Sequence, residues 1–136
     1  MVERLLIVAS LAFLIVGAWA LLRLWQAHRL RALAGERPLQ GLVPPGKPAV
    51  VAFTLPSCAE CRTRQAPALE QLRARRGAMA ALATIPADAY PNLVAQLGIL
   101  TVPATAVLDA EGRVRFLNQG FADVARLAAQ LDSVAA

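Results

Sequence analysis

The chain has 136 residues, of which 57% are hydrophobic, and a formal net charge of +5. This length allows one domain of ordinary size, and the apolar share exceeds the roughly 45–50% of soluble domains. The composition excludes a disordered chain and a multi-span transporter, and two cysteines are too few for a disulfide-stapled miniprotein. The apolar excess lies at the front, because residues 1–25 contribute 20 of the hydrophobic side chains.

The front of the chain predicts one membrane-spanning helix. Residues 5–22 contain no charge, and as a helix this run reaches about 27 Å, close to a hydrocarbon core of roughly 30 Å. Trp19 and Trp25 lie at its end with Arg23 between them, a pattern typical of a membrane interface. A cleaved signal peptide is the alternative, since residues 18–20 have the small-x-small form of a cleavage site.

The basic residues around this run predict the side of the membrane on which the rest of the chain lies. Only Arg4 precedes the run, whereas four arginines follow it: Arg23, Arg29, Arg31 and Arg37. The positive-inside rule therefore favours a single-pass protein of the plasma or inner membrane with a cytoplasmic C-terminal domain. A periplasmic or extracellular domain is the alternative. Because the other cations form no single stripe, no nucleic-acid partner is expected.

The remainder divides into a linker at residues 26–48, rich in proline near its end, and a domain at residues 49–136. Apolar runs and helix breakers predict a strand at 49–55, a helix at 58–76 kinked by Pro67, a weak strand near 81–85, a helix at 92–97, strands at 104–108 and 114–117, and a last helix after Gly120 with Phe121 on its apolar face. The order β-α-β-α-β-β-α indicates an α/β fold with a mixed sheet flanked by helices.

Cys58-Ala59-Glu60-Cys61 is the motif that carries chemistry, because it directly follows a predicted strand and opens a predicted helix. A helix N-terminus stabilises a thiolate, which is the nucleophile of disulfide exchange. Cys61 lies one turn further on the same face, within reach of a mixed disulfide formed at Cys58. The motif therefore predicts a redox pair with Cys58 as nucleophile and Cys61 as resolving thiol.

Three other interpretations of the two cysteines remain open. Half of a zinc site is one, but the chain has no other cysteine and its one histidine, His28, lies in the linker. A static disulfide that closes so short a loop adds little stability. Two inert buried thiols are the third. We expect no metal and no organic cofactor.

Residues 47–134 resemble the thioredoxin family, and the chain as a whole resembles a membrane-anchored thioredoxin-like protein of bacterial type. The matching features are the stretch Lys47–Phe53 before the Cys-x-x-Cys pair, the stretch Thr101-Val102-Pro103-Ala104-Thr105, and the turn ending in Glu111-Gly112. The resemblance implies a thioredoxin-like fold. It also implies that Pro103 is a cis-proline facing the cysteines, and that the backbone of Val102 binds a substrate strand.

The chain also departs from that family. Ser57, Ala59 and Glu60 replace the usual tryptophan and Gly-Pro around the cysteines, and Ala52 replaces a buried aspartate. The family's leading strand and helix have no clear counterpart. Glu60 and Arg62 are expected to tune the thiols, with the negative charge opposing the helix dipole and the positive charge acting with it.

These observations predict a membrane-tethered thiol-disulfide oxidoreductase of the protein-disulfide reductase type, with protein disulfides or thiols as substrates. A non-catalytic thioredoxin-like binding or assembly module at the membrane is the alternative, because several residues typical of the family's active site are replaced.

Overall fold

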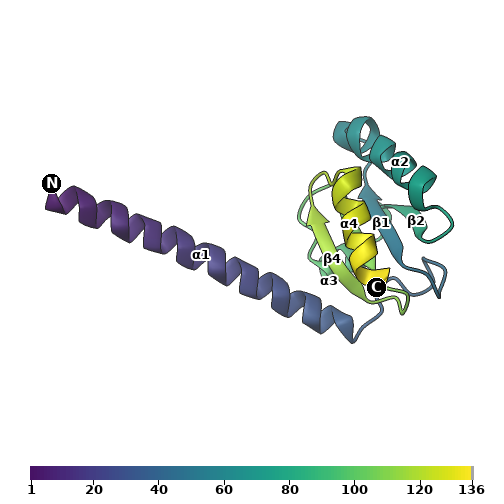
Figure 1. Ribbon diagram of the computed structural model, residues 1–136, viewed down its shortest axis with the longest axis horizontal. Coiled ribbons are helices and arrows are strands. Elements are labelled where there is room, and N and C mark those ends of the chain that lie inside the picture. Colours follow the sequence, from purple (N-terminus) through teal and green to yellow (C-terminus); the bar gives the residue numbers. More distant parts are fainter. Residues whose placement is uncertain (136) are drawn as a thin grey trace. The chain divides into compact units, whose positions relative to one another are not determined.

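The computed structural model describes residues 1–135, except for the side chain of Ala34, and divides the chain into two compact units. The first unit is Met1–Ala32, and the second begins at Leu33. We describe each unit by itself. Figure 1 labels the helices and strands of both.

The first unit lies within one helix, α1 (Val2–Ala34). Its apolar side chains are exposed, and its most apolar stretch has a mean hydropathy of 2.7. By length and composition it is able to cross a membrane, a property that signal sequences share. Two arginines lie over tryptophan rings one turn earlier: Arg23 is 4.8 Å from the Trp19 ring centre, and Arg29 is 4.9 Å from that of Trp25.

Helix α1 extends further than the sequence analysis expected. The sequence predicts a linker from residue 26, whereas the helix continues to Ala34. Residues 26–34 consist mostly of good helix formers, and Gly35 follows directly. Further along, Leu39 is fully buried, so part of the expected linker packs into the second unit.

The second unit is a four-stranded sheet in the order β2-β1-β3-β4. Its elements are β1 (Ala49–Thr54), the π-helix η1 (Cys61–Gln65), α2 (Ala66–Arg76), β2 (Ala81–Pro86), the 3-10 helix η2 (Ala87–Ala89), α3 (Pro91–Leu97), β3 (Ala104–Leu108), β4 (Val114–Gln119) and α4 (Val124–Ala135). Strand β1 pairs in parallel with β2 and antiparallel with β3, and β3 forms a hairpin with β4. The predicted order of elements and the mixed sheet are thus confirmed.

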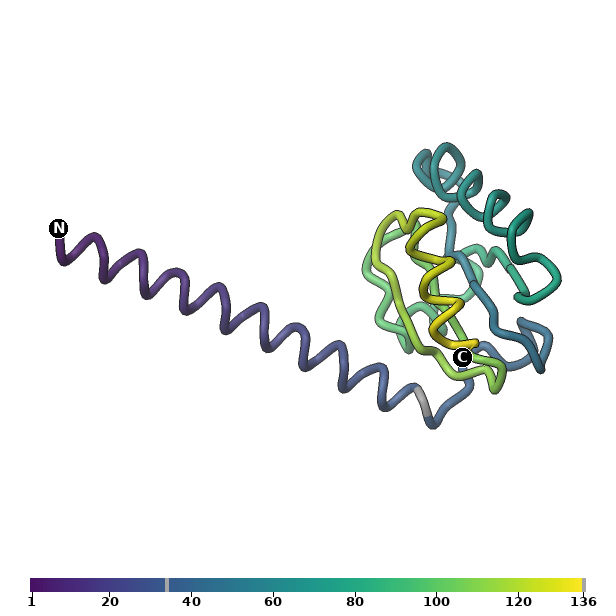
Figure 2. The backbone as a smooth tube through the Cα atoms, in the orientation of Figure 1, coloured from purple at the N-terminus to yellow at the C-terminus, as the bar shows by residue number. Residues whose placement is uncertain are grey.

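Alternate side chains of β1 are buried on opposite faces of the sheet, as the pleat of a strand requires. On one face Val50 packs in a core cluster with Leu72 of α2 and Leu127 of α4. Figure 2 shows α4, in yellow, alongside β1 although the two are far apart in sequence. Figure 1 shows α3 behind the sheet, on the side opposite α4.

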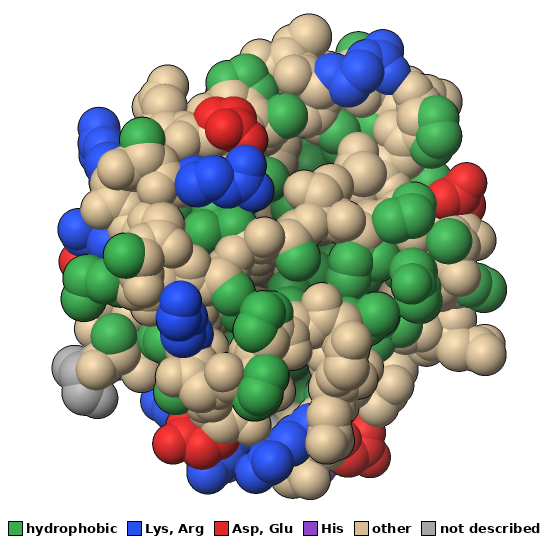
Figure 3. All heavy atoms as spheres, turned by 90° about the vertical axis from the view of Figure 1, so that its right-hand side faces the viewer, with side chains coloured by type: hydrophobic (Ala, Val, Ile, Leu, Met, Phe, Trp, Pro, Cys, Tyr) green, Lys and Arg blue, Asp and Glu red, His purple; other side chains and the backbone are tan. Residues whose placement is uncertain are grey.

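Strand β2 lies at an edge of the sheet and has only β1 as a neighbour among the described residues. Figure 3 looks onto this side of the molecule, where apolar side chains gather around a hollow. Leu82 of β2 is partly buried against the core cluster, and Met79, just before the strand, is 69% exposed.

Two local details refine the sequence analysis. Pro67 interrupts the helix, as the sequence predicts, and the interruption takes the form of a π turn in which the N–H of Ala66 bonds to the carbonyl of Cys61. This wider turn fits a proline that has no N–H of its own. Phe121 lies outside α4, because the side chain of Asp123 accepts the N–H of Arg126 at 2.8 Å and caps the helix there.

The β3–β4 turn is organised by one buried carboxylate. Asp109 is 4% exposed and accepts the backbone N–H groups of Glu111 and Arg113 at 3.1 and 2.9 Å. Its other oxygen lies 3.5 Å from the guanidinium of Arg115. Gly112 has a φ of 84°, which the turn requires and glycine adopts without strain.

Candidate functional site

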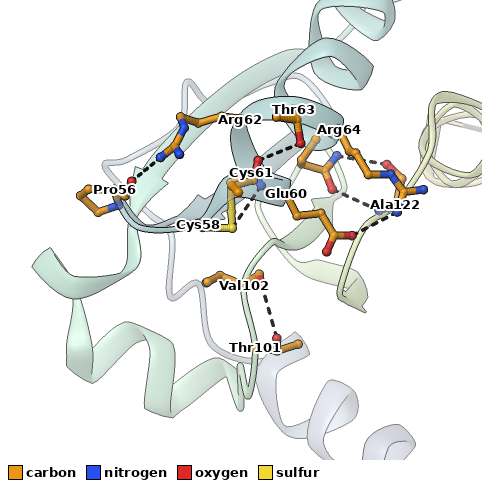
Figure 4. Close-up of a disulfide and its surroundings, with 12 residues drawn as sticks. Pro56, Cys58, Glu60, Cys61, Arg62, Thr63, Arg64, Thr101, Val102 and Ala122 are labelled. Carbon is orange, nitrogen blue, oxygen red and sulfur yellow. Dashed lines mark hydrogen bonds and ion pairs between the residues drawn. A yellow bond between two sulfur atoms is a disulfide. The ribbon is translucent and has the colours of Figure 1, made fainter.

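The two cysteines lie where β1 ends and the helical segment begins, and they form a disulfide. Cys58 is half-buried, whereas Cys61 is only 5% exposed. The backbone N–H of Cys61 donates a hydrogen bond to the sulfur of Cys58 at 3.1 Å (Figure 4). The more exposed cysteine is therefore the one whose sulfur faces a helix-end donor, an arrangement that stabilises negative charge on Cys58.

The turn before the cysteines holds this geometry. After β1, the N–H of Cys58 bonds to the carbonyl of Leu55 at 3.0 Å. Pro56 and Ser57 occupy the turn, and the guanidinium of Arg62 donates to the carbonyl of Pro56. Arg62 is exposed and its side chain extends along this turn, away from Glu60 (Figure 4).

Glu60 extends to the other side of the cysteine turn. Its carboxylate lies 3.4 Å from the guanidinium of Arg64, and both side chains are largely exposed. Arg64 in turn lies over the ring of Phe121, 4.2 Å from its centre. The two charged residues singled out from the sequence, Glu60 and Arg62, thus flank the disulfide on opposite sides and each has a partner of its own.

Val102 and Pro103 lie in the loop that leads into β3. Their peptide bond is cis, the isomer that the family resemblance implies. Ala104, the first residue of β3, pairs with Phe53 near the end of β1, and Figure 4 shows Val102 on the side of this loop that is nearer the cysteine turn than Thr101. Pro103 is fully buried, whereas Val102 is half-buried and Thr101 exposed. The fold therefore brings the predicted loop residues and the disulfide to one end of the sheet.

Gln65 is a site residue that the sequence analysis missed. It ends η1, one turn after Cys61, and is 2% exposed. Its side-chain amide donates to the carbonyl of Ala122 at 3.0 Å and accepts the N–H of Ala122 at 3.1 Å. A glutamine on the buried face of the helix, four residues after Cys61, is the only sequence signal for this contact, and its partner lies 57 residues away.

Gln119, at the end of β4, was also missed. Its side chain accepts the N–H of Leu100 at 3.1 Å and donates to the carbonyl of Gly98 at 2.9 Å. These bonds hold the loop that leads to Val102 and Pro103. Both contacts join an exposed side chain to backbone groups of another segment, and no sequence pattern predicts such contacts.

The buried polar side chains near the end of β1 that carries the disulfide are uncharged, namely those of Gln65 and Thr105. Ala52, which stands where the resemblance implies an aspartate, is 2% exposed and lies opposite Thr84 and Thr105 in the sheet. Among the described residues the one buried carboxylate is that of Asp109, at the far end of β3. Those residues also include no group of three or more His, Cys, Asp and Glu side chains able to hold a metal ion.

A separate cavity of about 460 Å³ lies at the opposite end of β1 and β3. Residues 37–47 and 108–112 form most of its wall, with Leu39 and Leu108 among the apolar side chains. It does not reach the cysteines, which lie at the other end of these strands.

Solved structures with the same architecture share this arrangement of elements. A thioredoxin from Fasciola hepatica is 21% identical, with a TM-score of 0.56, over 66% of this chain and 83% of that one. A thioredoxin-like protein from Clostridium perfringens is 23% identical, with a TM-score of 0.58, over 68% of this chain and 74% of that one. The chain has a thioredoxin-like fold.

A third structure is that of DsbF from MTB, described in mixed oxidised and reduced forms. It is 21% identical, with a TM-score of 0.54, and the match covers 66% of this chain and 82% of that one. No protein-family model and no curated protein matches the sequence. At these sequence identities the solved structures show only the thioredoxin-like fold. The activity of this chain is therefore inferred from the geometry of its site.

Proposed function

We propose that the chain is a membrane-tethered thiol-disulfide oxidoreductase of the protein-disulfide reductase type. The observation that carries the proposal is the half-buried Cys58, bonded to Cys61 at the start of a helical segment, with the N–H of Cys61 aimed at its sulfur. This geometry favours attack by Cys58 and resolution by the more deeply buried Cys61.

The reaction begins from the reduced dithiol, which a thiol donor regenerates. The Cys58 thiolate attacks one sulfur of a substrate disulfide, forming a mixed disulfide and releasing one substrate thiolate. The Cys61 thiolate then attacks the sulfur of Cys58 and releases the second substrate thiolate. Two electrons pass from the dithiol to the substrate, the released thiolates take up two protons, and Cys58–Cys61 becomes the disulfide.

The other predicted site residues have supporting roles in this proposal. Val102 offers its backbone to an extended segment of the substrate protein, and cis-Pro103 fixes the direction of that backbone. Glu60 and Arg62 adjust the stability of the thiolate from opposite sides of the turn. The dithiol itself is the redox group, with no metal or organic cofactor.

Turnover of a disulfide substrate tests the activity. The full-length chain in detergent is incubated with insulin and dithiothreitol, and reduction of the insulin disulfides is followed. Wild type is expected to accelerate the reaction, Cys58→Ser to abolish the acceleration, and Ser57→Ala to retain it. Equal rates for wild type and Cys58→Ser would rule the activity out.

A non-catalytic binding or assembly module is the second candidate. The alanine at position 52 favours it, because among the described residues the one buried carboxylate is that of Asp109, too far along β3 to assist the second thiol. A titration with defined thiol-disulfide buffers separates the two functions. An oxidoreductase shows a reversible two-electron couple in the physiological range, whereas a binding module need not.

The length and apolar character of α1 support membrane tethering, and the arginines after the apolar run favour a cytoplasmic position for the second unit. Labelling with a membrane-impermeant maleimide tests the orientation. After mild reduction, Cys58 is expected to react in permeabilised cells and not in intact ones. Equal labelling of intact cells would place the cysteines outside the cytoplasm.

A further inference from the structure

The last residue of β4 and the start of the connection to α4, together residues 119–122, contact the helical segment that carries Cys61 and the loop that leads to Val102 and Pro103. From one side Gln65 makes two hydrogen bonds with the backbone of Ala122, at 3.0 and 3.1 Å. From the other side Gln119 makes two hydrogen bonds with the backbone of residues 98 and 100, at 2.9 and 3.1 Å. Between them, Phe121 lies under the guanidinium of Arg64.

We propose that this connection is a common support that fixes the cysteine turn relative to the Val102–Pro103 loop. Gln65 and Gln119 are then positioning residues, which act through the backbone they hold and not through contact with the reacting sulfurs. The roles assigned to them in catalysis rest on the proposed oxidoreductase function, whereas the support itself does not.

Gln65 controls the cysteine side of this support. Its amide satisfies both polar groups of Ala122, a residue with no exposed surface. A rotation of η1 that moves Cys61 breaks two buried hydrogen bonds at once, and buried polar groups that lose their partners are costly. The direction from which Cys61 attacks the Cys58 sulfur is therefore restrained by a contact one turn away.

Gln119 controls the loop side. It holds Leu100, two residues before Val102, and the carbonyl of Gly98, which has a φ of 72° at the end of α3. Leu100 itself is 82% exposed, so few packing contacts of its own restrain it. The two hydrogen bonds with Gln119 thus restrain the exposed residue of the segment to which the substrate is proposed to bind.

The two glutamines are therefore expected to affect different kinetic constants. Gln119→Ala loosens the substrate loop and is expected to raise KM about threefold or more with little change in kcat. Gln65→Ala disturbs the resolving thiol and is expected to lower kcat by about threefold or more, with accumulation of the mixed disulfide.

Gln130→Ala is the matched control for both variants. The Gln130 amide makes two hydrogen bonds with Asn118, at 2.8 and 2.9 Å, and joins α4 to β4 without contacting the cysteine turn or the loop. This variant is expected to leave KM and kcat unchanged. A rise in KM as large as that of Gln119→Ala, or a fall in kcat as large as that of Gln65→Ala, would show a general effect on the fold and would overturn the corresponding positioning role.

Hydrogen exchange of single amides provides a readout that does not depend on activity. In the full-length chain in detergent, Gln65→Ala is expected to speed exchange at Ala122 and also at Leu100, because the two sites share the connection. Gln119→Ala, an exposed change that leaves the core intact, is expected to speed exchange at Leu100. If wild type shows no turnover, the proposed oxidoreductase function is wrong. The hydrogen-exchange rates still test whether residues 119–122 support both segments. Faster exchange at Ala122 alone in Gln65→Ala, with Leu100 unchanged, would overturn the common support, because loss of the local hydrogen bond explains that result.

Discussion

The guanidinium of Arg64 lies over the ring of Phe121, 4.2 Å from its centre, and 3.4 Å from the carboxylate of Glu60. The aromatic ring favours a cation above its face and so keeps Arg64 beside the acid. Arg62 is held separately by the carbonyl of Pro56. Three exposed charges, each with a partner, therefore surround the turn that carries Cys58.

Glu60→Gln is expected to raise the rate at which reduced Cys58 is alkylated by iodoacetamide at neutral pH. Removal of a nearby negative charge favours the thiolate, and for a solvent-exposed group the effect is about two- to threefold. Arg62→Gln is expected to slow the same reaction. Glu70→Gln is the control, since Glu70 pairs with Arg73 at 2.6 Å further along the chain in α2. An equal acceleration in Glu70→Gln would show that Glu60 has no specific effect on the Cys58 thiolate.

Cys61→Ser is expected to trap the substrate as a mixed disulfide on Cys58. The variant retains the accessible nucleophile and lacks the thiol that resolves the intermediate. Non-reducing electrophoresis after incubation with a disulfide-containing protein detects the adduct, which a reductant releases. The double variant Cys58→Ser/Cys61→Ser is the control, and an adduct in it would contradict the assignment.

Asp109→Ala is expected to lower the free energy of unfolding by about 2 kcal/mol. The carboxylate accepts two backbone N–H groups of the β3–β4 turn, and hydrogen bonds to charged groups contribute about 1.5–3 kcal/mol. Urea unfolding followed by far-UV circular dichroism measures the change. Glu111→Ala, an exposed change in the same turn, is expected to stay within about 0.5 kcal/mol of wild type. Equal stability of the two variants would argue against this role of Asp109.

Tryptophan emission is expected not to report the redox state of the cysteines. Both tryptophans, Trp19 and Trp25, lie in α1, and the unit that carries the disulfide has none. Emission spectra of the full-length chain before and after reduction with dithiothreitol test this. A large change would show that the disulfide communicates with α1.

The sequence predicts the two central strands well because β1 and β3 are short apolar runs bounded by prolines and glycines. Such runs are buried on both faces, as β1 and β3 are, and the pattern alone is enough to locate them. The end of α1 was misplaced, since helix formers in residues 26–34 outweighed the polar character that suggested a linker. The start of α4 was set by the Asp123 cap and not by the apolar face that seemed to include Phe121.

The cysteine pair and the proline loop were accessible to sequence reasoning because local motifs mark them. The contacts that hold them were not. Gln65 and Ala122 are 57 residues apart, and Gln119 reaches Leu100 over 19. Such pairs depend on how the sheet folds back on itself, and a single sequence contains no periodicity that reports them.

The alanine at position 52 has a consequence for protons in the proposed reaction. The one buried carboxylate among the described residues, that of Asp109, lies at the far end of β3, so no internal carboxylate relays a proton between the two thiols. Protons taken up or released with the two electrons must then exchange with solvent at the exposed end of the sheet. The midpoint potential is expected to vary with pH according to the two thiols alone, without an additional inflection from a third group.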